Sequence, residues 1–365
     1  MKLARHAILL LLSTANAAPA LAYAAPSSGD QPKLADRPNQ VIGNEINEKQ
    51  QLAVERGLAW LAAHQKADGS YTGDGMSPHA GITALAGLAF MQAGNLPGRG
   101  KYGSNVQRCL DFILNSCQES GLIANDQSHG PMYGHGFATL FLGEVYGMTG
   151  DERVKDKLQR AVRLIEKTQN TEGGWRYQPV PYDADISVTI CQVMALRAAR
   201  DAGLKVEKST IDKAIEYVRG CQNGDGGFSY MRRQGAGGNS GFARSAAGVA
   251  SLYYAGIFEG DDITRGLKYL VKFIPNRNGV ATNPEMEAHY YYGNYYAVQA
   301  MFLAGGDYWA KWYPAIRDQL VAKQNASSGS WSGDFSDDYA TSMALIILQM
   351  PNRYLPVYTG KGPGS

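Results

Sequence analysis

The 365-residue chain has little that would tie it to a membrane, a metal or a nucleic acid. After its first two dozen residues it has no apolar run near the roughly 20 residues that a membrane-spanning helix needs. Its formal net charge is only +2, so no broad positive field favours DNA or RNA. Its 4 cysteines include no CxxC pair and therefore no thiolate zinc motif. These absences favour a globular domain without a nucleic acid partner, and we predict no cofactor.

The cysteines are expected to be free thiols. Cys109 and Cys117 lie eight residues apart on one expected helix, about 12 Å at 1.5 Å per residue, which is too far for a disulfide. Cys117 and Cys221 each precede a glutamine of a repeated pattern, and Cys191 lies in an apolar segment. Buried, unpaired cysteines are therefore the prediction.

The chain begins with the pattern of a secretory signal peptide. Lys2 and Arg5 precede an apolar run from Ala7 to Leu12, and small Ala-x-Ala segments follow. We expect residues 1–24 to be cleaved and the mature protein to be secreted, or to lie in the periplasm or cell envelope. Residues 25–48 are rich in proline, serine, glycine and charge, which predicts a flexible linker.

A pattern of about fifty residues recurs along the remaining chain. Each copy has aliphatic residues at helical spacing, then glutamine, then glycine and often an aromatic residue. The glutamines are spaced by 53, 51, 53 and 102 residues, at Gln65, Gln118, Gln169, Gln222 and Gln324. A degenerate copy around Leu267, Leu270 and Ile274 fills the double gap. The repeat predicts six units over residues 49–355, and residues 356–365 are expected to be a flexible tail.

Each unit predicts two helices. The segment before the glutamine is amphipathic, and the glycine turn ends it. The second segment is apolar nearly all round, which indicates burial on both sides. These second segments are Ala80–Ala93, Gly136–Gly147, Ile186–Ala199, Gly241–Ala255, Tyr290–Ala304 and Tyr339–Met350. We therefore expect an all-α fold of six helical hairpins, with the second helices forming an inner ring.

The terminal units favour a closed ring over an open stack. The first unit carries Trp60 and Tyr71, and the last carries Trp331, so both are as apolar as the middle units. An open stack would need polar end repeats to cover its core. Closure of the first unit on the last is favoured, and an open solenoid is the alternative.

Gln-x-x-x-Gly followed by an aromatic residue resembles the QW repeat of squalene and oxidosqualene cyclases and of protein prenyltransferase β-subunits. The spacing is matched by Gln65/Gly69/Tyr71, Gln169/Gly173/Trp175 and Gln222/Gly226/Phe228, and with one inserted residue by Gln324/Gly329/Trp331. The match to this repeat covers nearly the whole mature chain, from about Gln50 to Pro351. The phrases Gly173-Gly174-Trp175-Arg176-Tyr177 and Asp185-Ile186-Ser187-Val188-Thr189 also resemble secreted bacterial prenyltransferase or squalene-oxidase repeat proteins. The resemblance implies an α/α toroid, a terpenoid cyclase-like ring of helices around an apolar cavity, with an apolar small molecule or lipid as ligand. The repeat residues themselves are expected to be structural.

Polar residues gather where the inner helices would begin: His79, His135, Asp183, Asp185, Arg244, Glu287, His289, Asp337 and Asp338. Asp183-Ala184-Asp185 resembles the Asp-x-Asp-Asp-Thr motif of squalene-hopene-type cyclases, whose middle aspartic acid protonates an alkene, and Asp185 falls on that position. Ile186 departs from the motif, which has a third aspartate there. The structural alternative is that Asp183 caps the N-terminus of a helix and that the positive end of the helix dipole stabilises the negative charge of Asp185.

A metal site is the weaker interpretation of these polar residues. Protein prenyltransferases use a zinc-bound thiolate, but residues 285–290 here include no cysteine. A site without thiolate would need ligands from separate repeats to converge, namely His79, His135, Asp185 and His289. We predict no metal.

Two further clusters leave their roles open. Aromatic faces could stabilise a carbocation, stack a sugar ring or fill the core, and the cluster is Tyr290, Tyr291, Tyr292, Tyr295 and Tyr296. A diphosphate or another anion could be bound by Arg232, Arg233 and Arg244.

Three functions remain in contention. The first is an isoprenoid-type enzyme in which Asp185 is the acid and Asp183 assists. The second is a non-catalytic binding or scaffold protein of the cell envelope. The third is a carbohydrate-active enzyme, with a carboxyl pair drawn from Asp183, Asp185, Glu287 and Asp338.

Overall fold

The computed structural model describes residues 45–73, 77–125, 130–232, 238–275, 287, 289–333 and 335–359. All the described residues belong to one compact unit. The expected signal peptide and most of the expected linker, residues 1–44, lie outside the described residues. No helix in the described ranges is long and apolar enough to cross a membrane.

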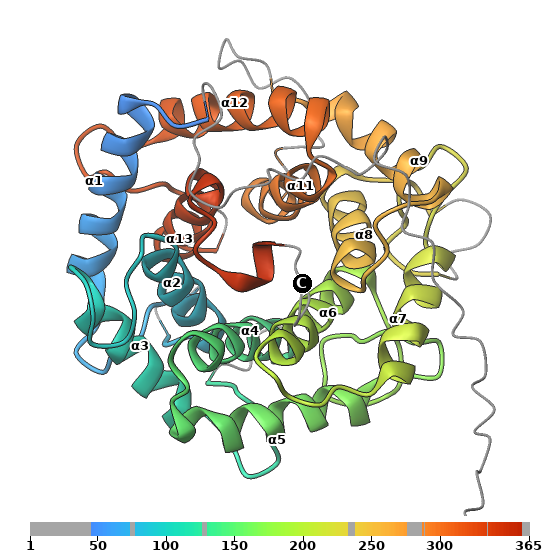
Figure 1. The fold of residues 1–365 in the computed structure, drawn as a ribbon, viewed down its shortest axis with the longest axis horizontal. Helices are drawn as coiled ribbons and strands as arrows, with labels where there is room; N and C mark the ends of the chain where they lie inside the picture. The colour runs from blue at the N-terminus through green and yellow to red at the C-terminus, as the bar shows by residue number, and fades with distance from the viewer. Residues whose placement is uncertain are drawn as a thin grey trace, which may run out of the picture. The chain divides into compact units, whose positions relative to one another are not determined.

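Two concentric sets of helices make up this unit (Figure 1). The outer helices are α1 (Glu48–His64), α3 (Gly103–Asn115), α5 (Glu152–Thr168), α7 (Lys208–Gly220), α9 (Asp261–Leu270) and α12 (Gly306–Lys323). The inner helices are α2 (Ala80–Gln92), α4 (Met132–Thr149), α6 (Ile186–Asp201), α8 (Phe242–Tyr254), α11 (Tyr290–Ala304) and α13 (Asp337–Leu348). Short 3₁₀ turns are η2 (Val271–Phe273), η3 (Met350–Asn352) and η4 (Pro356–Thr359). The predicted α/α toroid of six helical hairpins is confirmed.

The two helix sets differ in burial as the sequence pattern predicts. In α5 only one stripe is buried, including Val154, Leu158 and Ile165, while charged residues cover the rest. In α2 every residue is buried. An inner helix packs on an outer helix and on both inner neighbours, which is why it has no polar face.

The repeated glutamine and glycine join successive outer helices. Gln169 ends α5, and its Nε2 donates to the carbonyl of Gly173 at 2.9 Å and to that of Thr210, in the first turn of α7, at 2.8 Å. Gly173 has a φ of 99°, and a Cβ there would lie 2.1 Å from the Lys213 carbonyl oxygen. Only glycine combines this left-handed conformation with so close an approach. The same paired donation is made by Gln65, Gln222 and Gln324.

The aromatic residue that four of the repeats carry joins the outer helix to the inner one. The Trp175 indole N–H donates to the Ile165 carbonyl at the end of α5, at 2.7 Å. Its backbone N–H donates to the hydroxyl of Thr189 on α6, at 3.1 Å. Equivalent backbone bonds run from Tyr71 to Thr83, from Phe228 to Ser245 and from Trp331 to Thr341. The repeat residues therefore satisfy helix ends and hold the hairpins together.

The last repeat closes on the first. Gln324 donates to the Ala53 carbonyl of α1 at 2.8 Å, as its counterparts donate to the next outer helix. The Asp338 carboxylate accepts from both the backbone N–H and the hydroxyl of Thr72, each at 2.9 Å. Contacts of α1 with α12 and α13 complete the ring. An open solenoid is excluded for this unit.

Both ends of the domain extend past the expected boundaries. Glu45 is buried and accepts a hydrogen bond from the Trp309 indole, although it falls in the expected linker. Leu355, Val357 and Tyr358 are buried, although two of them fall in the expected tail. That expectation was wrong for residues 356–358, because the centre of the ring provides apolar surface that a short segment can cover. Residues 360–365 lie outside the described residues.

Candidate functional site

The carboxyl of Asp185 lies at the start of α6 and is fully buried. Its backbone N–H pairs with the Trp175 carbonyl at 2.9 Å, which fixes the turn between the repeat aromatic and the inner helix. One carboxyl oxygen, Oδ1, accepts the Val188 N–H at 2.8 Å and caps the helix. Asp185, not Asp183, is therefore the N-cap, which corrects the structural alternative drawn from the sequence.

The second oxygen of Asp185 lies 3.6 Å from Nε of Arg176. The Tyr230 hydroxyl is the other polar neighbour of this carboxyl. The other end of the Arg176 guanidinium pairs with Asp183, which is only partly buried. The two aspartates thus share one arginine, which bonds directly to Asp183 and lies beside Asp185.

Four half-buried tyrosines surround this carboxyl and are called here the tyrosine cluster: Tyr133, Tyr177, Tyr230 and Tyr292. The Tyr177 and Tyr230 hydroxyls are hydrogen-bonded to each other. The ring of Tyr133 lies 6.1 Å from that of Tyr177 and 6.4 Å from that of Tyr292. The Tyr292 hydroxyl donates to the Ser187 carbonyl in the first turn of α6, at 2.7 Å. The cluster brings together α4, α11 and the turns that lead into α6 and α8.

Burial is the main cause of the raised pKa of the Asp185 carboxyl. Desolvation raises the pKa of its carboxyl to about 6, against the opposing effects of hydrogen bonds from the Val188 N–H and the Tyr230 hydroxyl and of the Arg176 charge. Burial, and then the charge of Asp185, raises the pKa of Tyr133 and of Tyr230, so both hydroxyls stay neutral. The site therefore holds one carboxyl that is protonated in mildly acidic solution, among neutral aromatic rings.

Two family profiles match consecutive parts of the chain. The profile of the prenyltransferase α/α toroid domain matches residues 39–138, and that of the squalene-hopene cyclase C-terminal domain matches residues 138–303. Over residues 39–303 the chain is thus similar to the α/α toroid domains of prenyltransferases and squalene-hopene cyclases. No curated protein matches it significantly.

Solved structures of proteins with two different activities share this toroid fold. The type II terpene cyclase MstE from Scytonema superposes with a TM-score of 0.58 at 12% identity, over 84% of this chain and 98% of that one. An α-1,6-mannanase from Salegentibacter sp. HEL1_6 superposes with a TM-score of 0.63 at 8% identity, over 82% and 98%. At such identities the likeness establishes the toroid fold and leaves the chemistry open.

Three of the predicted site residues have structural partners in this toroid. His79 caps α2, where its Nδ1 accepts the Gly81 N–H at 3.1 Å. His135 accepts the Ile123 N–H at 3.2 Å, as Thr189 does for Trp175 in the next repeat. Burial lowers the pKa of His135 to about 4, so its ring is neutral. Asp338 binds Thr72 and closes the ring, as described above.

The remaining predicted residues lie at several places. Tyr292 belongs to the tyrosine cluster, whereas Tyr295 is fully buried with its hydroxyl 3.3 Å from that of Tyr358. Arg244 lies half-buried in the first turn of α8, and His289 is exposed just before α11. Asp337 is exposed at the start of α13. Arg233 lies outside the described residues.

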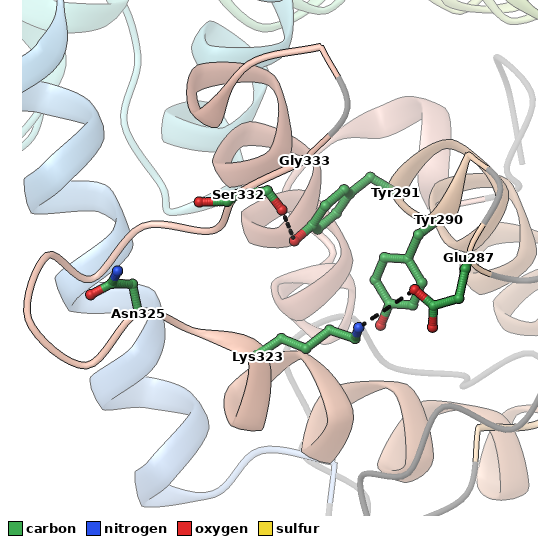
Figure 2. Close-up of a pocket in the computed structure, with 7 residues that line it drawn as sticks. All are labelled: Glu287, Tyr290, Tyr291, Lys323, Asn325, Ser332 and Gly333. Atoms are coloured by element: carbon green, nitrogen blue, oxygen red, sulfur yellow. Dashed lines mark hydrogen bonds and ion pairs between the residues drawn. The ribbon is translucent and has the colours of Figure 1, made fainter.

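Glu287 lines a separate polar pocket of about 390 Å³ (Figure 2). Its carboxylate lies 3.8 Å from Nζ of Lys323, whose ammonium sits over the Tyr290 ring. Tyr291 closes one side by donating to the Ser332 carbonyl at 3.1 Å. Neither Asp183 nor Asp185 lines this pocket. Within the described part of the chain, no three His, Cys, Asp or Glu side chains converge as metal ligands would.

Sequence reasoning missed Arg176, Tyr177, Tyr230 and Tyr133 as members of the site. A signal for two of them exists in the repeats: Trp175-x-Tyr177 and Phe228-x-Tyr230 both place a tyrosine two residues after the repeat aromatic. That spacing directs the two hydroxyls toward each other across neighbouring units. Tyr133 has no comparable signal.

Proposed function

We propose that this toroid is a terpenoid cyclase-like enzyme in which Asp185 protonates an alkene of an isoprenoid substrate. The observation that carries the proposal is the fully buried carboxyl of Asp185, whose Oδ2 lies beside Arg176 and next to the tyrosine cluster. An acid for this step must be neutral before transfer, and the raised pKa of Asp185 supports that state in mildly acidic solution.

The step balances within the named groups. The Asp185 Oδ2–H bond breaks, the proton forms a C–H bond at one alkene carbon, and the other carbon becomes cationic. The carboxylate left behind lies 3.6 Å from the Arg176 guanidinium, which stabilises it. This arginine supplies the support that the third aspartate would give where Ile186 stands. The tyrosine faces can stabilise the cation until it loses a proton or takes up water.

Product analysis tests the proposal. We expect the purified chain to convert squalene or a prenylated aromatic compound at pH 5–6, with products resolved by mass spectrometry. Asp185→Asn keeps the oxygen that caps α6 and removes the acid, so conversion should fall by about 10³-fold or more. A native chain that leaves every polyprenyl substrate unchanged would contradict the proposal.

Asp183→Asn is the matched control. It removes the carboxylate that holds Arg176, so the arginine charge acts more strongly on Asp185 and lowers the pKa of that acid. We expect activity to persist, with its pH profile moved to lower pH. Equal loss of activity in both variants at every pH would argue against distinct roles for the two aspartates.

Carbohydrate hydrolysis is the second candidate. Two aspartates at one arginine and several partly exposed tyrosine rings also suit a sugar substrate. A structure of the similar mannanase, in an inactive variant with two aspartates replaced, holds α-1,6-mannotriose. Release of reducing ends from α-1,6-linked mannose oligomers, lost in both Asp183→Asn and Asp185→Asn, would favour it over the cyclase.

Export to the cell envelope is part of the proposal. Its support is the order of charged, apolar and small residues over positions 1–24. Expression of the full chain with its native start, followed by N-terminal sequencing of the mature protein, should show a new terminus near residue 25. An intact Met1 on the cytoplasmic protein would contradict export.

A further inference from the structure

The pocket that Glu287 lines lies apart from Asp185, where α11 begins and α12 ends (Figure 2). Its walls come from the start of α11, the end of α12 and the segment before α13, and the lining residues are Glu287, Tyr290, Tyr291, Lys323, Asn325, Ser332 and Gly333. The volume of about 390 Å³ is near the lower end of the range for ligand pockets, roughly 300–1,000 Å³. A ligand of this pocket is therefore a small molecule.

Hydrogen bonds within the protein hold the walls of this pocket in place. The Tyr290 hydroxyl donates to Oε1 of Gln319 on α12 at 2.6 Å. The Tyr291 hydroxyl donates to the Ser332 carbonyl at 3.1 Å. The two tyrosine rings meet edge to face, with their centroids 5.1 Å apart. The pocket is thus shaped by the fold itself and does not need a ligand in order to form.

Two opposite charges face each other in the pocket. The Glu287 carboxylate lies 3.8 Å from Nζ of Lys323, beyond the roughly 2.7–3.2 Å of a hydrogen bond. The two side chains are 46% and 36% exposed, and an exposed ion pair of this kind adds little to stability. No other described residue that lines the pocket is charged. Both charges can therefore pair with a ligand at small cost to the fold.

The arrangement of these charges selects the class of ligand. A lone anion would be attracted by Lys323 and repelled by Glu287, and a lone cation would meet the reverse. A sugar ring packs best against an open aromatic face, but Tyr290 and Tyr291 are only 6% and 7% exposed. The Lys323 ammonium also covers the Tyr290 ring, 4.7 Å from its centroid. A molecule that carries both charges close together satisfies both groups.

The side of the pocket opposite Glu287 is polar but uncharged (Figure 2). Oδ1 of Asn325 accepts the backbone N–H groups of Ser327 and Ser328, at 2.9 and 3.0 Å. The amide nitrogen of Asn325 is therefore the group that can donate to a ligand. The Ser332 carbonyl, which accepts from Tyr291, keeps a second lone pair. A ligand side chain placed here meets one donor and one acceptor.

We propose that this pocket binds a free α-amino acid with an uncharged polar side chain. The ammonium nitrogen and the carboxyl carbon of such a molecule lie about 2.5 Å apart, because both are bonded to the same carbon. The ammonium pairs with Glu287, and the carboxylate pairs with Lys323. The side chain lies between Asn325 and Ser332, where an amide such as that of glutamine finds both partners. Asp185 has no part in this binding.

Calorimetric titration of the full chain tests the pocket. L-glutamine should bind at one site with a Kd of about 0.1 mM. N-acetyl-L-glutamine lacks the ammonium and L-glutaminamide lacks the carboxylate, so each should bind at least about tenfold more weakly. Absence of glutamine binding, equal affinity for either blocked derivative, or binding of mannose in place of glutamine would overturn the proposal.

Two variants assign the two charges. Glu287→Gln and Lys323→Gln each remove one charge, and both should melt near the temperature of the native chain because these side chains are partly exposed. Each should weaken glutamine binding at least about tenfold. Glu287→Gln should also abolish the preference over N-acetylglutamine, and Lys323→Gln the preference over glutaminamide. Native affinity in either variant would contradict the proposed pairing.

Glu152→Gln is the matched control. Glu152 pairs with Lys155 at 3.2 Å on the exposed face of α5 and does not line this pocket. Its loss should leave glutamine binding unchanged, whereas an equal loss of affinity would mean that only the overall charge of the protein matters. Asp185→Asn should bind glutamine as the native chain does, so failure of the cyclase assay and failure of this pocket are distinguishable.

Discussion

Asp185 serves two purposes with its two carboxyl oxygens. Oδ1 caps α6, and Oδ2 lies beside Arg176. The sequence predicted both a capping aspartate and an acid, but it assigned them to different residues. The assignment depends on where the helix begins, which a sequence pattern locates only to within one or two residues.

The raised pKa of Asp185 makes a prediction about stability. The folded chain keeps this proton up to about pH 6, whereas the unfolded carboxyl releases it near 3.8. The free energy of unfolding should therefore fall as pH rises through that window, by an Asp185 contribution on the order of 2–3 kcal/mol. Asp185→Asn should lose that part of the dependence. Urea unfolding at pH 4 and pH 7 measures it; identical pH dependence in both proteins would contradict the raised pKa.

His135 should show the opposite dependence. Its folded pKa of about 4 lies below the unfolded value of 6.5, so stability should decrease as pH falls through this range. His135→Ala removes the acceptor of the Ile123 N–H and leaves a cavity, at a cost of about 2–4 kcal/mol near neutral pH. The deficit of the variant should shrink toward pH 4, as chemical denaturation can measure. A deficit that grows on acidification would mean that the buried ring is charged.

At the scale of the helix, the turns of the repeat carry the strongest sequence constraint. Gly173 and Gly203 both have left-handed backbones, with φ of 99° and 89°. A Cβ at Gly173 would meet the Lys213 carbonyl at 2.1 Å, whereas nothing lies within 4 Å of one at Gly203. We expect Gly173→Ala to cost at least about 2 kcal/mol more than Gly203→Ala, because only the first adds a backbone clash to the conformational strain. Equal melting temperatures would contradict this account of the joint.

Helices and turns were predictable because their signals repeat. Spacing of aliphatic residues gave the outer helices, and uniform apolarity gave the inner ones. The site was less predictable because its members come from α4, α11 and two turns, and only Tyr177 and Tyr230 follow the repeat spacing. His135 on α4 accepts the same repeat hydrogen bond that Thr189 accepts on α6. The sequence does not reveal this equivalence, because histidine and threonine share no recognisable pattern.

At the scale of the whole molecule, closure makes the last joint equivalent to the internal ones. Gln324 donates to Ala53 across the seam, as Gln169 donates to Thr210 within the chain. We expect Gln324→Ala and Gln169→Ala to lower the free energy of unfolding by similar amounts, about 1–2 kcal/mol each. A negligible effect for Gln324→Ala alone would indicate a seam that is open in solution.

The filled centre of the toroid could not be predicted from the sequence. The repeat ends near residue 355, and the short remainder contains proline and glycine but no helical pattern. The C-terminal segment is buried because the closed ring has an apolar inner surface, which the segment shields from water. Local composition carries no information about such a distant surface.

The central claim is that the Asp185 carboxyl remains protonated well above the usual aspartate range. Carbon-13 NMR of the chain labelled at aspartate carboxyl carbons, compared with Asp185→Asn to assign the signal, measures this directly. We predict a titration midpoint near pH 6 for Asp185. A midpoint at or below pH 4 would contradict the account, because the acid would then be ionised wherever the protein works.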